Sequence, residues 1–404
     1  MTQTVPPDRP NGRASEVFAA FLKLGVSAFG GPIAHLGYFR EAFVRRRGWL
    51  DEETYADLVA LCQFLPGPAS SQTAIGIGLI RAGPLGALAA WAAFTLPSAI
   101  LMTAFAYGAA AMTGPLAQGL IHGLKLVAVA VVAQAVFGMA RTLTPDARRA
   151  AIALGAVILV TVASASLGQV AAIALGAIAG LYLCRDAGPA PGTGHSFALP
   201  RRVGLVALGL YLVLLIGGPI LAAATGQPAA ARFDAFYRSG ALVFGGGHVV
   251  LPLLQEAVVR PGWIDQNTFL AGYGAAQAMP GPLFTFAAYL GAAMRGPPNG
   301  VAGAALGLVA IFIPGVLALF ATLPFWSRLR ARPAARAAMR GANAAVVGIL
   351  AAALYDPVWT SAVMGPADFA AALAGFVLLT AFRAPPILVV LLAAGFGVAS
   401  GLRT

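Results

Sequence analysis

The sequence predicts an all-α polytopic membrane protein, built as two inverted-topology repeats that contain broken half-helices or re-entrant hairpins. Three observations support this fold class. The chain of 404 residues is 59% hydrophobic and only 10% charged, whereas a soluble domain carries roughly 25% charged residues. Breaks rich in glycine and proline occur twice at the same spacing, and the basic loops change place between the two copies. Duplicated, interrupted apolar segments are typical of membrane transporters.

The duplication is clearest at two motifs. Phe-Gly-Gly-Pro at residues 29–32 returns as Phe-Gly-Gly-Gly at residues 244–247. Gln-Phe-Leu-Pro-Gly-Pro at residues 63–68 returns as Gln-Ala-Met-Pro-Gly-Pro at residues 277–282. The copies lie 214 or 215 residues apart. The best-matched residues are therefore helix breakers, and in transporters built from repeats the broken helices mark the substrate site.

The repeats are expected at residues 15–185 and 231–404. Residues 1–14 form a polar N-terminal tail without the apolar stretch of a cleavable signal peptide. Residues 186–202 are polar and rich in glycine and proline, which predicts an exposed cytoplasmic linker. The apolar run 203–224 is long enough to span a bilayer and has no counterpart before repeat one. This connecting helix would turn the second repeat upside down.

The loop charges agree with such an inversion. Residues 45–47 are three arginines, and the second copy of this loop has only one. The loop at 113–115 has no base, whereas its copy at 328–340 has five arginines. The loop at 141–149 has three arginines, and its copy around 355–357 has none. Since basic loops are typically cytoplasmic, the two halves are expected to have opposite topology.

The apolar segments fall into two classes, and in each repeat the short ones come before the spans. Nine are expected to span the membrane: 84–112, 116–140, 150–165, 169–183, 203–224, 300–323, 337–354, 369–382 and 387–402. Eight others measure roughly 16–22 Å as helices and cannot cross alone: 15–28, 33–47, 54–65 and 69–81, with copies at 234–243, 249–259, 268–279 and 283–295. Broken backbone at membrane depth must be covered by protein or water, so these half-helices are expected at the centre.

The breaks offer an anion-binding site. Pro32, Pro68 and Pro282 each follow a glycine and precede a helical run, where proline is favoured. With Gly247 they give four helix N-termini of roughly +0.5 charge each, on the order of +2 in total, which suits a dianionic oxyanion. The alternative is that these residues only allow tight turns and close packing. The binding candidates at the breaks are Gly30, Gly31, Pro32, Pro66, Gly67, Pro68, Gly245, Gly246, Gly247, Pro280, Gly281 and Pro282.

Three basic residues are further binding candidates. Lys23 and Arg238 both lie six residues before the phenylalanine of the first motif, among apolar neighbours. A buried base is costly in a bilayer and indicates function, so both are expected to face one central anion. The alternative is that they reach the membrane surface with their long side chains. Lys125 lies inside a predicted span, and its counterpart is Asn343.

Hydroxyl and amide groups complete the predicted binding site. Ser70 and Ser71 lie in the first turn after the second break, and Thr285 is the counterpart of Ser71. They either donate to a bound oxygen or simply cap the helix. Gln63 and Gln277 come just before the breaks, where an amide either pairs with loosened backbone or touches the substrate.

Four titratable residues are candidates for proton coupling. His35 and His248 follow the glycine breaks, and Glu41 and Glu256 are counterparts. Such groups are rare at membrane depth and are often part of proton pathways. A histidine near a helix start is also a common hydrogen-bonded structural residue, and that alternative stays open.

Other function classes find no support in the sequence. It has no His-Glu-x-x-His motif, no Walker loop and no Cys/His cluster, so neither an enzyme nor a metal or other cofactor is expected. Cys62 and Cys184 lie in or beside apolar segments and are expected to be core residues. The net charge of +12 comes from loop arginines and does not indicate a nucleic-acid partner. The residues alone predict a carrier for a small oxyanion, with an anion channel as the alternative.

At these motifs the sequence resembles the chromate ion transporter family in its long, two-domain form. The resemblance rests on residues 29–35, 61–72, 244–252 and 272–285, and it covers both halves. It implies a secondary transporter in the bacterial inner membrane that exports chromate, driven by the membrane potential or the proton gradient, and confers chromate resistance. Sulfate, another tetrahedral dianion, is the alternative substrate, with uptake as the alternative direction. The lipid bilayer is the expected partner, and a homodimer stays open.

Overall fold

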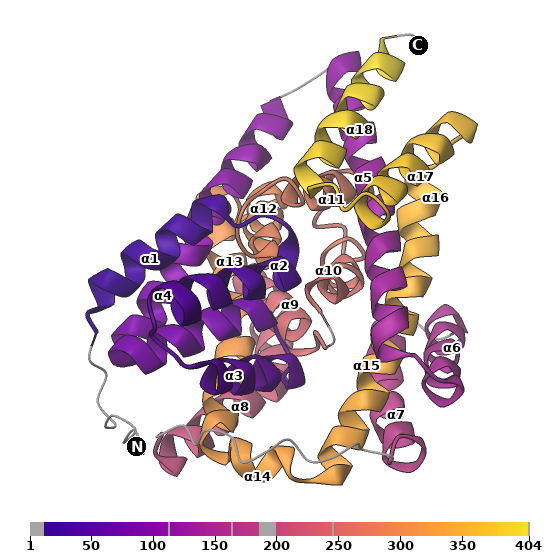
Figure 1. Ribbon diagram of the computed structural model, residues 1–404. Coiled ribbons are helices and arrows are strands. Elements are labelled where there is room, and N and C mark those ends of the chain that lie inside the picture. Colours follow the sequence, from indigo (N-terminus) through magenta and orange to yellow (C-terminus); the bar gives the residue numbers. More distant parts are fainter. Residues whose placement is uncertain (1–11, 112–113, 163–164, 186–198, 245, 403–404) are drawn as a thin grey trace.

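The computed structural model describes residues 12–111, 114–162, 165–185, 199–244 and 246–402. Within these ranges all regular secondary structure is helical (Figure 1). Most of the N-terminal tail, most of the predicted linker and Gly245 lie outside the described residues.

The half-helices of repeat one occur where the sequence predicts them. Its first part consists of α1 (Ala14–Ser27), α2 (Gly31–Phe39), the π-helical η1 (Arg40–Arg46), α3 (Glu52–Phe64) and α4 (Ala69–Ala111). The range of α4 contains both the last half-helix and the following span, and a kink separates them where the backbone leaves helical geometry at Ala82 and Gly83. The second part consists of α5 (Pro115–Leu143), α6 (Ala147–Val162), α7 (Ala165–Leu183) and the connecting helix α8 (Arg201–Thr225).

Repeat two follows the same order. Its first part is α9 (Pro228–Ala241), η2 (Gly247–Val249), α10 (Val250–Val258), α11 (Gln266–Ala276), η3 (Leu283–Thr285), α12 (Phe286–Ala293) and α13 (Gly300–Thr322). Its second part is η4 (Leu323–Phe325), α14 (Trp326–Arg330), α15 (Pro333–Ala353), η5 (Leu354–Trp359), α16 (Thr360–Ala362), α17 (Pro366–Thr380) and α18 (Pro386–Gly401). In this repeat, a short 3-10 turn opens each helix that follows a break.

Matching side chains start the third half-helix of each repeat. The Asp51 carboxylate accepts a hydrogen bond from the Thr54 N–H at 2.7 Å and so caps α3. Its counterpart Asp265 accepts from the Thr268 N–H at 2.9 Å and caps α11. Because aspartate is a strong N-cap residue, these sequence matches have a direct local cause.

Fewer helices are long enough to span than the nine that the sequence predicts. Within the described residues, five helices are long and apolar enough to cross a membrane: 69–111, 115–143, 201–225, 300–325 and 333–362. Of these, α8 is almost unburied, with only 6% of its apolar window covered by protein, as expected for a helix that faces lipid. The predicted spans at 150–165, 169–183, 369–382 and 387–402 correspond to helices of only 15 to 19 residues. Hydropathy alone could not separate them from full spans.

The four short helices form two equivalent hairpins. The α6–α7 hairpin packs against α15 of the other repeat, and the α17–α18 hairpin packs against α5. In Figure 1, α17 and α18 lie at the upper end of the α5 and α15 pair, and α6 and α7 lie at the lower end. Equivalent hairpins at opposite ends are what two inverted repeats produce.

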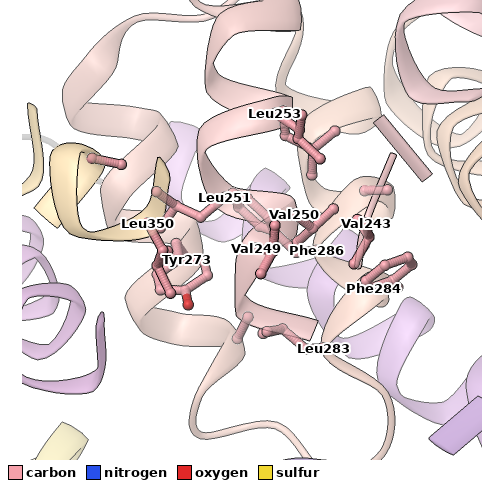
Figure 2. Packing of buried hydrophobic residues seen from close by; sticks show 14 of the residues in the cluster. Val243, Val249, Val250, Leu251, Leu253, Tyr273, Leu283, Phe284, Phe286 and Leu350 are labelled. Carbon is pink, nitrogen blue, oxygen red and sulfur yellow. The ribbon is translucent and has the colours of Figure 1, made fainter. Parts of the chain in front are cut away.

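The hydrophobic core is divided unevenly between the repeats. The largest cluster surrounds the half-helices of repeat two and also takes in residues of α6, α7 and α15. Figure 2 shows part of it, with Val249, Tyr273 and Leu283 among the buried side chains. A second cluster joins the half-helices of repeat one to the end of α13. The breaks of repeat two are therefore the more deeply enclosed.

Candidate functional site

The second break of each repeat meets the first break of the other repeat. The Gly67 N–H donates to the Val243 carbonyl oxygen at 2.8 Å, and the counterpart Gly281 N–H donates to the Ala28 carbonyl oxygen at 2.9 Å. Ala28 and Val243 are also counterparts, since each precedes a Phe-Gly-Gly motif. This reciprocal pair of hydrogen bonds brings the breaks of both repeats together at one place.

Gly67 and Gly281 are glycines for two physical reasons. Their φ angles are +116° and +87°, in the left-handed region where a side chain is strained. A Cβ atom on Gly67 would lie 3.0 Å from Cα of Gly315, and one on Gly281 would lie 3.0 Å from the Phe94 carbonyl oxygen. The backbone conformation and the close approach of the neighbouring helix both require glycine here.

The first breaks also contact each other across the repeats. Gly30 caps α2 and Pro32 lies in its first turn, while Gly247 begins η2. A Cβ atom on Gly247 would lie 3.4 Å from Cγ of Pro32, whereas one on Gly31 would meet nothing within 4 Å. Gly246 precedes η2 with a positive φ. The backbone of the first break of repeat one therefore has free space beside Gly31 that a side chain would not fill with a clash.

The hydroxyls and three of the four prolines of the second breaks are buried, whereas Pro66 is half-buried. Pro68 precedes α4, Pro282 precedes η3, and Pro280 is also buried. Thr285 donates to the Pro282 carbonyl at 2.8 Å and lies 2.8 Å from the Ser98 hydroxyl, so its hydroxyl is already bonded within the protein. Ser70 is buried, and Ser71 Oγ is buried without a hydrogen-bond partner. The Ser71 hydroxyl therefore has unused bonding capacity inside the protein.

The two amides differ between the repeats. Gln277 is half-buried and donates to the Tyr273 carbonyl at 3.3 Å, one turn earlier in its own helix. Gln63 is exposed. The amide that holds the first repeat's second break together is instead that of Gln72, which donates to the carbonyls of Pro66 and Gly315, each at 2.9 Å. The sequence analysis missed Gln72, although it lies within the same motif.

A cavity of about 430 Å³ lies beside α9 of repeat two, near the meeting point of the breaks. The ends of α8 and α10, one side of α9 and the start of α7 from repeat one line it, and Leu242 on its wall directly precedes Val243. Two predicted residues, Arg238 and Glu256, line this cavity together. Lys23, the counterpart of Arg238, lies outside it.

Each arginine of this cavity is paired with a carboxylate one turn earlier. Arg238 contacts Asp234 at 2.7 Å, and Arg260 contacts Glu256 at 2.5 Å. The Asp234 side chain is only 4% exposed, and its Oδ1 atom is buried without a hydrogen-bond partner. The sequence analysis missed Asp234 because it compared the repeats, and its counterpart in repeat one is Ala19.

The expected burial of the two matched bases is not observed. The Arg238 side chain is 49% exposed, and Lys23 is exposed on a face of α1 that also presents Phe18, Leu22 and Val26. The half-helices are short enough for long side chains to leave the protein interior. The two bases therefore do not enclose a shared site in this conformation.

Lys125 belongs to a separate polar cluster. Its ammonium group donates to Asn267 Oδ1 at 3.0 Å and lies near Asp368. The Asp368 carboxylate contacts His122 Nε2 at 2.7 Å. This cluster joins α5 to α11 and α17, and it lies outside the meeting point of the breaks.

The predicted proton-coupling residues have different surroundings. His35 is buried with Nε2 3.2 Å from the Ala28 carbonyl oxygen, and His248 Nδ1 lies 2.7 Å from the Tyr273 hydroxyl. Glu41 is exposed and contacts Arg45 and Arg46. The hydrogen bond from Arg46 lowers the pKa of the Glu41 carboxyl below its ordinary value, so this group stays ionised.

No group of three or more His, Cys, Asp or Glu side chains that could hold a metal ion occurs among the described residues. Cys62 and Cys184 are buried free thiols. The polar groups around the breaks are amides, hydroxyls and main-chain N–H groups, and the neighbouring cavity adds two guanidinium groups that are paired with carboxylates. Such donors suit an anion.

Comparisons with known proteins agree with the repeat structure. The profile of the family described as "Chromate transporter" matches residues 15–181 and again residues 230–398. The chromate transport protein of Pseudomonas aeruginosa is 28% identical over 98% of this chain and 93% of its own length. The probable chromate transport protein of Synechococcus elongatus is 28% identical over 83% of this chain and 82% of its own.

The chromate transport protein of Cupriavidus metallidurans is 24% identical, over 88% of this chain and 87% of its own length. No solved structure matches this chain. The family profile occurs twice and covers most of both halves, in agreement with the two inverted repeats seen in the structure. The chain therefore belongs to the chromate transporter family.

Proposed function

We propose that this protein is a secondary carrier that exports chromate across the bacterial inner membrane and thereby confers chromate resistance. The observation that carries the proposal is the repeat-two cavity with Arg238 and Arg260, next to the meeting point of the helix breaks. Membership of the family and the names of the three relatives support chromate as the substrate. Guanidinium groups bind tetrahedral oxyanions through paired, charge-assisted hydrogen bonds.

The paired carboxylates suggest how binding is controlled. Without substrate, Asp234 and Glu256 neutralise Arg238 and Arg260. A dianion can take the Arg238 guanidinium only when Asp234 releases it, either by moving or by taking up a proton. Because an unpaired buried carboxylate is costly, proton uptake by Asp234 would favour anion binding and make it dependent on pH.

Uptake of labelled chromate into everted membrane vesicles tests substrate and direction together. We expect saturable uptake that depends on an imposed gradient, with sulfate as a weaker competitor. Asp234→Asn, which is nearly isosteric, is expected to lower the KM on the order of tenfold and to flatten the pH dependence, because a competing charge is lost. Flux that rises linearly with chromate and needs no gradient would instead indicate a channel, and equal competition by sulfate would reject chromate specificity.

A further inference from the structure

The repeat-two cavity reaches the surface of the protein beside the loop that joins α10 to α11. Arg260 and Pro261 of this loop line the cavity and are exposed, and 56% of the Arg260 side chain is accessible. A charged side chain is costly among the acyl chains of a bilayer and stable at its surface. The mouth of the cavity therefore lies at one surface of the membrane.

The loop charges indicate which surface this is. Residues 259–265 are the copy of residues 45–51 in repeat one, since Trp49 and Asp51 return as Trp263 and Asp265. The first copy begins with three arginines, and basic loops of this kind are typically cytoplasmic. In an inverted repeat the second copy reaches the opposite surface, so the mouth is expected to face the periplasm.

The course of α8 gives the same answer without reference to that loop. Near its start, a Cβ atom on Gly204 would lie 3.0 Å from the ring of Phe325 in η4, which leads into the basic segment 328–340. Near its end, a Cβ atom on Gly218 would lie 2.8 Å from Asp234 Oδ1 in the cavity wall. At 1.5 Å per residue these two contacts lie roughly 21 Å apart along the helix. Since the hydrocarbon core of a bilayer is about 30 Å thick, the cavity lies toward the surface opposite the basic segment.

The wall that α7 contributes is also remote from the basic surface. A Cβ atom on Gly180, near the end of α7, would lie 2.8 Å from Cα of Gly341, which directly follows Arg340. Gln169, near the start of α7, lines the cavity and donates to the Pro252 carbonyl oxygen at 3.3 Å. In Figure 1, α14 lies at the lower edge of the protein, and α9 and α10 lie well above it. Two helices therefore run from the basic surface to the cavity.

Contacts between two loops hold the mouth in place. Trp263 lines the cavity, and the Arg232 Cζ atom lies 5.8 Å from the centre of its ring. The Arg232 side chain is buried and donates to the carbonyl oxygens of Arg295 at 2.7 Å and Gly296 at 2.8 Å. Because tryptophan is enriched at membrane surfaces, its position at the mouth agrees with an opening to water.

We infer that the cavity opens to the periplasm in this conformation, so that the structure is an outward-facing state of the carrier. Arg260 with Glu256 lies at the mouth, whereas Arg238 lies one turn from Leu242 and so nearer the breaks. An anion that leaves Arg238 passes Arg260, and each guanidinium offers it a charge-assisted contact on the way. Calling this path an exit rests on the proposed export, whereas the side on which the cavity opens does not.

Cysteine labelling from the two sides of the membrane tests the inference. In a background without the two native cysteines, Ser239→Cys and Ala257→Cys each place one thiol in the cavity wall. The reagent is a methanethiosulfonate that carries a sulfonate group, so it is anionic and does not cross membranes. Both variants are expected to react at least about tenfold faster in spheroplasts than in everted vesicles, because a thiol reacts as the thiolate and needs contact with water.

Two further variants serve as controls. Ala331→Cys is exposed in the basic segment 328–340 and is expected to react only in everted vesicles. Val213→Cys replaces a side chain that is 65% exposed in the middle of α8 and faces lipid. It is expected to react with N-ethylmaleimide, which enters membranes, and to resist the anionic reagent from both sides.

The inference is overturned if the cavity thiols react from the same side as Ala331→Cys, or if they resist the anionic reagent from both sides as Val213→Cys does. Labelling after denaturation shows that each thiol is present and free. Uptake of labelled chromate by the cysteine-free background is measured in parallel. Labelling from the periplasmic side without chromate uptake would count against the proposed function and leave the side of opening as inferred.

Discussion

The two repeats carry the same breaks but differ in how tightly these are enclosed. In repeat two, α11 packs against α5, and α10 packs against α7 and α15. In repeat one, over the residues that the structure describes, α3 has no comparable contact with α15 and α2 has none with α18. The burial of matched residues differs in the same direction. The Glu41 side chain is 42% exposed, and that of its counterpart Glu256 is 15% exposed.

This difference has its origin in the helices around the breaks and not in the breaks themselves. Both repeats keep the N-cap aspartate, the left-handed glycine of the second break and the hydrogen bond across the repeats. Inverted repeats with matching elements can exchange packing arrangements, and such an exchange moves a central site from one side of the membrane to the other. The comparison therefore predicts a second state in which α3 packs against α15 and α11 leaves α5.

Cross-linking is the most severe test of the proposed exchange of packing between the repeats. Lys125 and Asn267 connect α5 and α11 in this structure, and their counterparts are Asn343 on α15 and Glu53 on α3. In a background without Cys62 and Cys184, Glu53→Cys/Asn343→Cys is expected to react with a short, cleavable thiol cross-linker only during turnover. Transport should then stop completely and recover on cleavage.

The matched pair Lys125→Cys/Asn267→Cys should cross-link readily without substrate, because these side chains already touch. Single-cysteine variants control for modification alone. If Glu53→Cys/Asn343→Cys never cross-links while chromate is transported, the proposed exchange of packing between the repeats is wrong.

Removing the matched bases is expected to affect uptake differently in the two repeats, with a smaller effect than the complete loss caused by cross-linking. Arg238→Ala removes charge-assisted contacts in the cavity and leaves Asp234 without its partner, so uptake is expected to fall on the order of 100-fold. Lys23→Ala abolishes transport only if Lys23 also reaches the substrate in the second state. Initial rates at equal membrane levels of each variant measure this, and wild-type uptake by Arg238→Ala would remove the cavity from the transport path.

The carboxylates should give the smallest effects and the clearest contrast. The hydrogen bond from Arg46 lowers the pKa of Glu41, so this group stays charged as the pH falls through the ordinary carboxylate range. Glu41→Gln is therefore expected to leave the pH profile of uptake unchanged between about pH 5 and pH 8. Glu256→Gln, which removes the carboxylate that contacts Arg260 in the cavity, is expected to lower the uptake rate more than Glu41→Gln does. Equal uptake by both variants would mean that the deeper burial of Glu256 has no effect on transport.

Much of the fold followed from local sequence patterns. Duplicated breaks predicted the half-helices, since glycine and proline act on the backbone at their own positions. Composition predicted the membrane environment, and the alternation of basic loops predicted the inversion. These signals depend on neighbouring residues or on side-chain chemistry alone, so they can be detected without knowledge of the tertiary contacts.

The arrangement of the site depended on contacts between distant segments. Whether Lys23 is buried is decided by which helices cover α1, and the pairing of Asp234 with Arg238 matters because α7, α8 and α10 enclose a cavity around them. The hydrogen bonds of Gly67 to Val243 and of Gly281 to Ala28 each join residues that lie more than the length of one repeat apart in the sequence, so no local pattern predicts them. By itself the sequence determined where the helices break and what charge the breaks favour. Only the tertiary structure decided which breaks meet and which repeat is closed, because burial is a property of the surrounding helices and not of the buried residue.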